Sequence, residues 1–124
     1  MKFAEQFEDL EIWQDSRHLY RRVYGLLKEC RDFYFRDQMQ RASLSVMNNI
    51  SEGFERRTKK DFAHFLDLAK ASAGEVRSMS YAAEDVKIMN SVDAKFIAST
   101  LPVVTRNERH FQQIKGLQLK VIGS

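Results

Sequence analysis

Few residues of this chain have the types and spacings that chemistry on a substrate requires. Glu52 follows Asn49 by three positions and Glu75 follows Ser72 by three, so each pair shares one face of a helix. Nothing near these carboxylates in the sequence supplies a nucleophile, a metal or a phosphate cradle. We therefore predict no catalytic residues and no enzyme activity. With Arg41, these residues are predicted to form a buried or interfacial polar network that fixes helix register. A catalytic carboxylate pair is the alternative.

One pair of residues has the spacing of a metal site in a helical bundle. Asp61 and His64 lie at i and i+3, but a carboxylate-bridged site needs two such pairs and two further carboxylates. His18 and His110 have no partner at that spacing. The sequence therefore predicts no metal and no cofactor.

A cluster of basic residues fits a polyanionic partner. Arg56, Arg57, Lys59 and Lys60 surround Thr58 in an expected turn between two helices. In a symmetric ring such turns would face the same way and could bind the phosphate backbone of RNA or DNA. The alternative is a solvated loop whose charge favours the C-terminus of the preceding helix. The arginines elsewhere look scattered, without interleaved aromatic residues: Arg17, Arg21, Arg22, Arg106 and Arg109.

Localisation is predicted from cysteine use and from the lengths of the apolar runs. Cys30 is the only cysteine, so no internal disulfide can form and a reducing, cytoplasmic setting with a structural thiol is expected. No apolar run approaches the roughly 18 to 20 residues that span a bilayer, and the N-terminus does not resemble a signal peptide. We expect no membrane partner. The net charge of +3 only slightly favours an anionic one.

The elements that must position these residues are predicted to be four helices. Apolar residues recur at helical spacing over about 9–29, 33–56, 59–89 and 92–118. Asp32, Thr58 and Ser91 are the expected N-caps. Pro102 should kink the fourth helix, or break it into two. Short connections favour an all-α, antiparallel up-down-up-down four-helix bundle, with residues 1–124 as a single domain.

The apolar residues exceed the needs of one bundle. The expected core face of the first helix contains Leu10, Trp13, Tyr20, Val23 and Leu27, and those of the other helices follow the same period through Val86 and Phe96. Further apolar residues lie outside these faces: Leu19, Tyr24, Leu44, Met47, Phe65, Leu68 and Met79. They predict subunit contacts, and a wide core face is the alternative.

Three segments resemble a known family. Residues 38–56, QMQRASLSVMNNISEGFER, resemble the Q-x-R-R-A…S-I…N-I-A-E-G…R core of the four-helix-bundle proteins encoded in bacterial 23S rRNA intervening sequences. Residues 7–13, FEDLEIW, are similar to that family's F-x-D-L-x-V-W opening. Residues 62–75, FAHFLDLAKASAGE, are similar to its F-x-x-F-L-x-x-A-x-G-S-x-x-E segment. The chain departs from these patterns at Gln40, Met47, Ser51 and Ala71.

The resemblance implies a cytosolic bundle that assembles into a ring, commonly a homopentamer. A related branch comprises accessory proteins of diversity-generating retroelements, which bind nucleic acid through a basic surface and partner a reverse transcriptase. We therefore expect a non-enzymatic homo-oligomer that associates with RNA or DNA through its basic turn. The alternative is a protein-binding adaptor or scaffold for a partner enzyme such as a reverse transcriptase.

Overall fold

The computed structural model describes residues 4–105, with side chains up to residue 100. This part of the chain contains a short 3-10 helix and four α-helices and no strand, which confirms the all-α class and the number of helices. The elements are η1 (Phe7–Asp9), α1 (Glu11–Leu27), α2 (Phe33–Phe54), α3 (Lys59–Asp85) and α4 (Ser91–Thr105). The predictions for residues 106–124, including Arg106, Arg109 and the end of the fourth helix, lie outside the described residues.

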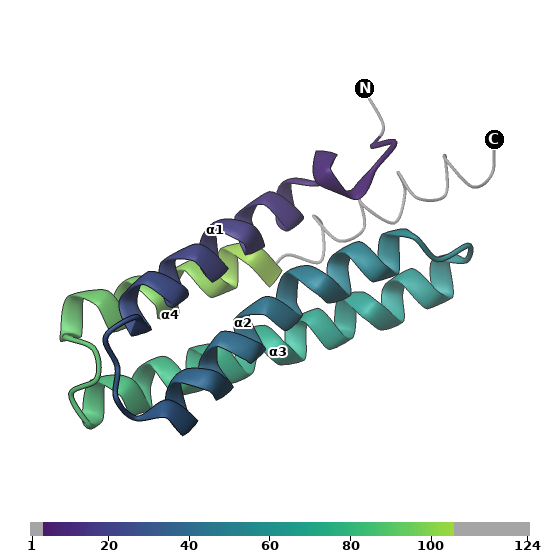
Figure 1. Ribbon diagram of the computed structural model, residues 1–124. Helices are drawn as coiled ribbons and strands as arrows, with labels where there is room; N and C mark the ends of the chain where they lie inside the picture. Colours follow the sequence, from purple (N-terminus) through teal and green to yellow (C-terminus); the bar gives the residue numbers. More distant parts are fainter. Residues whose placement is uncertain (1–3, 106–124) are drawn as a thin grey trace.

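The four helices pack as a bundle in which each helix contacts two others (Figure 1). The contact between α2 and α3 is the most extensive, and α1 and α4 complete the bundle on its other side. The α1–α2 and α3–α4 connections lie at one end, and the α2–α3 turn lies at the other (Figure 1). The α4 helix runs through Pro102 to Thr105, so it is not broken there.

The core is built from the apolar face of every helix. Burying a large aliphatic or aromatic side chain contributes about 1.5–3 kcal/mol, so this face is the main source of stability. Small residues such as Ala69, Ala73 and Ser80 lie between the large ones on α3 and let its neighbours approach. The largest fully buried side chains are Phe62, Ile12, Leu19, Leu27, Met39, Ile50, Ile97, Val23, Val46 and Val76.

Side-chain caps begin three of the helices. Asp32 Oδ1 accepts a hydrogen bond from the Phe35 amide at 3.0 Å, and Thr58 Oγ1 accepts one from the Asp61 amide at 3.1 Å. Both satisfy amides that lack an intrahelical partner, as predicted. The prediction that Ser91 is the N-cap of the fourth helix was wrong. Asn90 caps α4 by accepting from the Asp93 amide at 2.8 Å, and Ser91 is the first helical residue.

The α3 helix ends at Asp85, four residues before its predicted end at residue 89. Lys87 has a φ of 63°, in the left-handed region. Its amide donates to the Glu84 carbonyl at 3.1 Å, and the Ile88 amide donates to the Ala83 carbonyl at 2.8 Å. These two bonds form a Schellman motif, which usually has glycine at the left-handed position. Because this position holds a lysine and not a glycine, the sequence does not indicate where the helix ends.

The core face of α1 is rotated from the one we predicted. Leu19, expected outside the core, is buried together with Ile12, while Trp13 and Tyr20 are only half-buried. Phe96 and Val86 are exposed, so their predicted core positions were also wrong. Large aromatic residues on α1 therefore lie at the rim of the core rather than within it.

Candidate functional site

The basic cluster lies at the turn between α2 and α3, where residues 55–60 are all exposed. Lys59 and Lys60 are the first two residues of α3. The N-terminus of a helix carries partial positive charge, so each cation there costs about 0.3–1 kcal/mol. Asp61 in the same turn offsets part of this cost. Local stability alone does not account for two lysines at this position.

The four cations of the turn differ in their contacts. Arg56 Nη2 pairs with Glu52 Oε1 at 3.1 Å, and its guanidinium lies 4.7 Å from the centre of the Phe65 ring. Within the described part of the chain, Arg57, Lys59 and Lys60 make no ion pair. Arg56 is thus held against the bundle, and the other three cations face solvent.

A polar contact joins α2 and α3 at mid-length. Ser45 Oγ and Ser72 Oγ are 2.9 Å apart, and Asn49 Nδ2 donates to both the carbonyl and Oγ of Ser45 at 2.9 Å. Ser45 precedes Thr58 by about as many residues as separate Thr58 from Ser72, so the two serines lie at the same depth in an antiparallel pair. We define these three residues as the polar seam.

The structure brings together only part of the predicted network. Asn49 and Ser72 meet through Ser45, which sequence reasoning did not include among the site residues. Arg41 and Glu75 are exposed and do not pair with each other, and Glu52 pairs with Arg56 instead. The equal offset of Ser45 and Ser72 from the turn was the signal that could have identified Ser45.

Gly53 explains how α2 and α3 approach so closely near the turn. A Cβ atom added to Gly53 would lie 2.7 Å from Phe65 Cβ and 3.0 Å from Phe62 Cδ1. No side chain larger than hydrogen fits there without a shift of the helices. The glycine therefore places the Phe65 ring, and with it Arg56, at the edge of the turn.

His64 and Cys30, two further side chains with reactive groups, each contact a neighbouring residue. His64 packs edge-on against Phe65, with ring centroids 5.7 Å apart, and Cys30 Sγ lies 3.6 Å from the Asp32 carbonyl. No group of three or more His, Cys, Asp or Glu side chains suited to a metal occurs in residues 4–100. No helix in the described region is long and apolar enough to cross a membrane.

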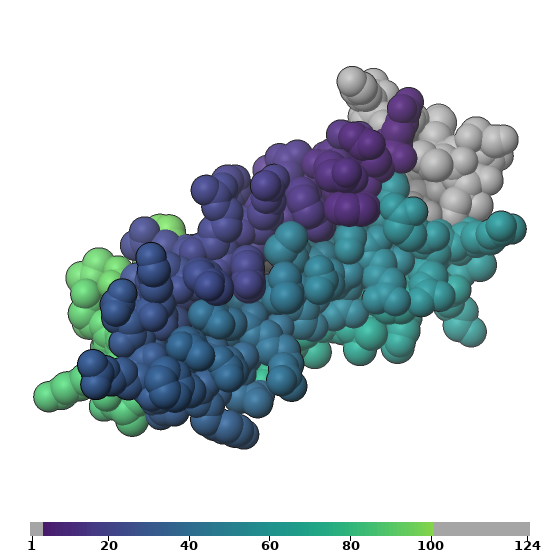
Figure 2. Space-filling model, viewed as in Figure 1, coloured from purple at the N-terminus to yellow at the C-terminus, as the bar shows by residue number. Residues whose placement is uncertain are grey.

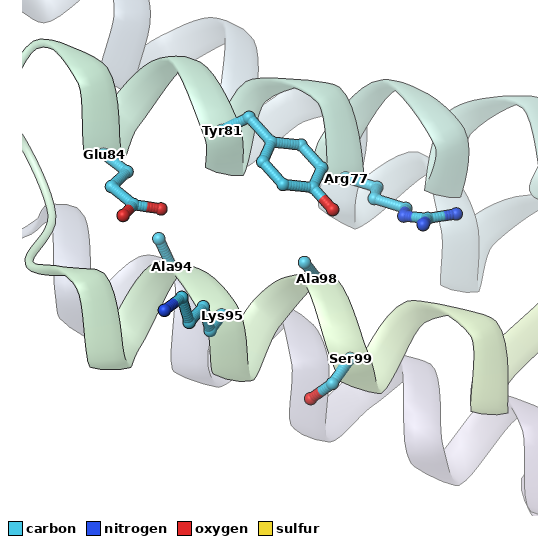
Figure 3. Close-up of a pocket in the computed structure, with 7 residues that line it drawn as sticks. All are labelled: Arg77, Tyr81, Glu84, Ala94, Lys95, Ala98 and Ser99. Carbon is cyan, nitrogen blue, oxygen red and sulfur yellow. The ribbon is translucent and has the colours of Figure 1, made fainter.

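An open groove of about 280 Å³ runs between α3 and α4 (Figure 3). Tyr81, Arg77 and Glu84 line its α3 side, and the small residues Ala94 and Ala98 line the α4 side. Lys95 and Ser99 also line the groove, and Ser99 Oγ donates to the Phe96 carbonyl at 2.9 Å.

Comparison with known proteins identifies the family. Residues 8–106 match the family model described as 23S rRNA-intervening sequence protein. A crystal structure from Bacteroides thetaiotaomicron, a protein of unknown function from the S23 ribosomal protein family, superposes with a TM-score of 0.68 at 19% identity. The match covers 91% of this chain and 99% of that one. No curated protein matches the chain. The chain belongs to the 23S rRNA-intervening sequence protein family.

Proposed function

We propose that this member of the 23S rRNA-intervening sequence protein family is a non-enzymatic protein that associates with RNA through its α2–α3 turn. In this proposal each chain is an antiparallel up-down-up-down bundle and one subunit of a cyclic homo-oligomer, a pentamer, in the cytoplasm. Closed symmetry would repeat the turn on one side of the ring, so the cations of all copies would act on the same polyanion.

The observation that carries the proposal is the position of Lys59 and Lys60. They occupy the first two residues of α3, where the helix dipole disfavours positive charge, and with Arg57 they are exposed and make no ion pair within the described residues. Contacts with phosphate oxygens would offset the unfavourable interaction of these cations with the helix dipole. Such contacts orient a nucleic acid and read little of its sequence.

The test is binding of a structured RNA at several salt concentrations. Replacing Arg57, Lys59 and Lys60 together by Ala should weaken binding and reduce the slope of log K against log salt by about one for each phosphate that the variant no longer neutralises. The matched control removes three exposed cations elsewhere, with Lys70, Arg77 and Lys95 replaced by Ala. Undetectable RNA binding at low salt, or equal effects of the two triple variants, would contradict the proposal.

A second candidate function is that of an adaptor for a partner enzyme such as a reverse transcriptase. It is favoured by large exposed apolar side chains near the α1–α2 and α3–α4 connections. These connections lie at the end of the bundle opposite the basic turn (Figure 1). Phe33 and Tyr34 begin α2, Val86 follows α3 and Val92 lies in the first turn of α4, and Tyr34 is 77% exposed. Aromatic residues are enriched at the centres of protein interfaces. Loss of partner capture on Tyr34→Ser, with RNA binding unchanged, would separate this role from the first.

A further inference from the structure

Aromatic and cationic side chains alternate along one face of α1. Residues three or four positions apart share a face of a helix, and the series 13, 17, 20 or 21, 24 and 28 follows that spacing. Its members are Trp13, Arg17, Tyr20, Arg21, Tyr24 and Lys28, which we call the α1 track. At 1.5 Å per residue the track is about 22 Å long. The arginines that look scattered in the sequence are thus interleaved with aromatic rings in the helix.

Among the rings of the α1 track, Tyr24 is exposed and Trp13 and Tyr20 are half-buried. Tyr24 is 49% exposed, and its ring centre lies 6.0 Å from that of Tyr20, with the planes tilted by 49°. The Arg17 guanidinium lies 5.8 Å from the centre of the Trp13 ring. Phe7 packs edge-on against Trp13, with ring centroids 5.1 Å apart. In the view of Figure 2, α1 and α2 form the near surface of the molecule.

The charge of the α1 track is positive throughout. Arg17, Arg21 and Lys28 are exposed, and none of them makes an ion pair with another described residue. The acidic residues Glu11 and Asp15 belong to α1 but fall outside the spacing of the track. On the neighbouring helix α2, Asp37 pairs with Arg36 at 3.3 Å. The track therefore lacks a carboxylate at its own positions to neutralise its cations.

We propose that the α1 track binds single-stranded nucleic acid, with bases stacked on the tyrosines and phosphates held by Arg17, Arg21 and Lys28. Proteins that bind single strands combine a cationic path for the backbone with exposed rings on which bases stack, because every base has a π-face. The track has both components at repeating intervals. This inference rests on the proposed association with RNA, but it assigns the contact to the bases at a surface distinct from the α2–α3 turn.

The chain contains its own reporter for this contact. Trp13 is the only tryptophan, so its fluorescence reports on the track alone. The full-length protein is titrated with an unstructured oligouridylate of about 12 nucleotides, within the range of about 4–16 that single-strand binding folds cover. Stacking or displacement of Arg17 should quench Trp13. Tyr24→Leu should weaken binding by about tenfold, since stacking on one ring changes affinity by roughly five- to 150-fold.

Two matched variants make the test specific. Tyr81→Leu removes a tyrosine of similar exposure from α3, away from the track, and should leave the affinity for oligouridylate unchanged. Arg21→Gln should reduce the salt slope by about one without abolishing quenching. The helical circular dichroism of each variant should match that of the original protein.

The outcomes separate this inference from the proposed function. Quenching together with a selective loss on Tyr24→Leu supports the α1 track. If RNA binding depends on Arg57, Lys59 and Lys60 but not on Tyr24, and Trp13 is not quenched, the inference about the α1 track is wrong and the proposed function stands. No binding of any RNA overturns both. A smaller assembly for Tyr24→Leu, measured by light scattering without RNA, would make the face a contact between copies of this chain and would also overturn the inference.

Discussion

Gly53 lies in the last turn of α2 and Gly74 in the interior of α3, and the two have opposite surroundings. Glycine in a helix interior costs about 1 kcal/mol relative to alanine, and a glycine in the last turn costs less. At Gly53 an added methyl group would lie 2.7 Å from the Cβ of Phe65. At Gly74 nothing lies within 4 Å of an added Cβ. The first glycine is therefore required by packing within the chain, and the second is not.

Replacement of each glycine by alanine should change the free energy of unfolding in opposite directions. Gly53→Ala should lower the free energy of unfolding by about 1–2 kcal/mol, because overpacking against Phe65 exceeds the gain in helix propensity. Gly74→Ala should raise it by up to about 1 kcal/mol. Urea unfolding followed by circular dichroism measures both. Equal effects of the two variants would contradict the assigned close contact at Gly53.

The polar residues of α2 show what the sequence could and could not predict at the residue scale. Asn49 in a helix indicated a polar partner across the helix pair, but it donates to Ser45 on its own helix, and only Ser45 reaches across to Ser72. Arg41 and Glu75 were predicted to join this network, but both are exposed and form no ion pair with each other. Spacing along a helix defines a face, whereas a hydrogen bond also depends on side-chain length and rotamer, which the sequence does not encode directly.

At the scale of elements, helix starts were better predicted than helix ends. Asp32 and Thr58 accept from amides three residues on, which is the capping chemistry their side chains allow. The end of α3 was predicted four residues too late because Lys87 adopts the left-handed conformation usually taken by glycine. The predicted core face of α1 was wrong because its aromatic residues were assigned to the core, whereas their rings lie at the rim of the core.

The left-handed conformation of Lys87 is one that glycine adopts at a lower cost. A non-glycine residue in that conformation costs roughly 1–2 kcal/mol. Lys87→Gly should therefore raise the midpoint of urea unfolding, with a gain of about 1 kcal/mol. The control Lys70→Gly, in the exposed interior of the same helix, should lower stability by about 1 kcal/mol. A loss of stability on Lys87→Gly would refute the Schellman motif at this end.

At the scale of the whole molecule, the two ends of the bundle differ in their exposed side chains. The cations of the α2–α3 turn lie at one end, and Phe33, Tyr34, Val86 and Val92 lie at the other (Figure 1). The sequence contained both sets, but their separation follows from the packing of the helices. In a ring whose subunits lie along its axis, the basic turns would lie on one side, and these apolar residues would lie on the other side together with exposed cations such as Arg31 and Lys87.

Assembly itself is predicted to use the α2–α3 face. Leu44 on α2 is 37% exposed and is adjacent in sequence to Ser45 of the polar seam. Leu68 on α3 is 39% exposed and lies one helical turn before Ser72. A contact between copies would cover these leucines, and a charge placed among them would remain unpaired. Light scattering at micromolar concentration should give about five times 14.5 kDa for the original chain and a monomer for Leu68→Arg.

The matched control places the same charge at the far end of the bundle. Val92→Arg, at a residue that is 76% exposed, should leave the assembled mass unchanged. Helical circular dichroism must be the same for both variants, so that dissociation is not confused with unfolding. A monomeric original chain would contradict the ring. An intact assembly with Leu68→Arg would move the subunit contact away from the α2–α3 face, because an arginine buried without a partner destabilises an interface by several kcal/mol.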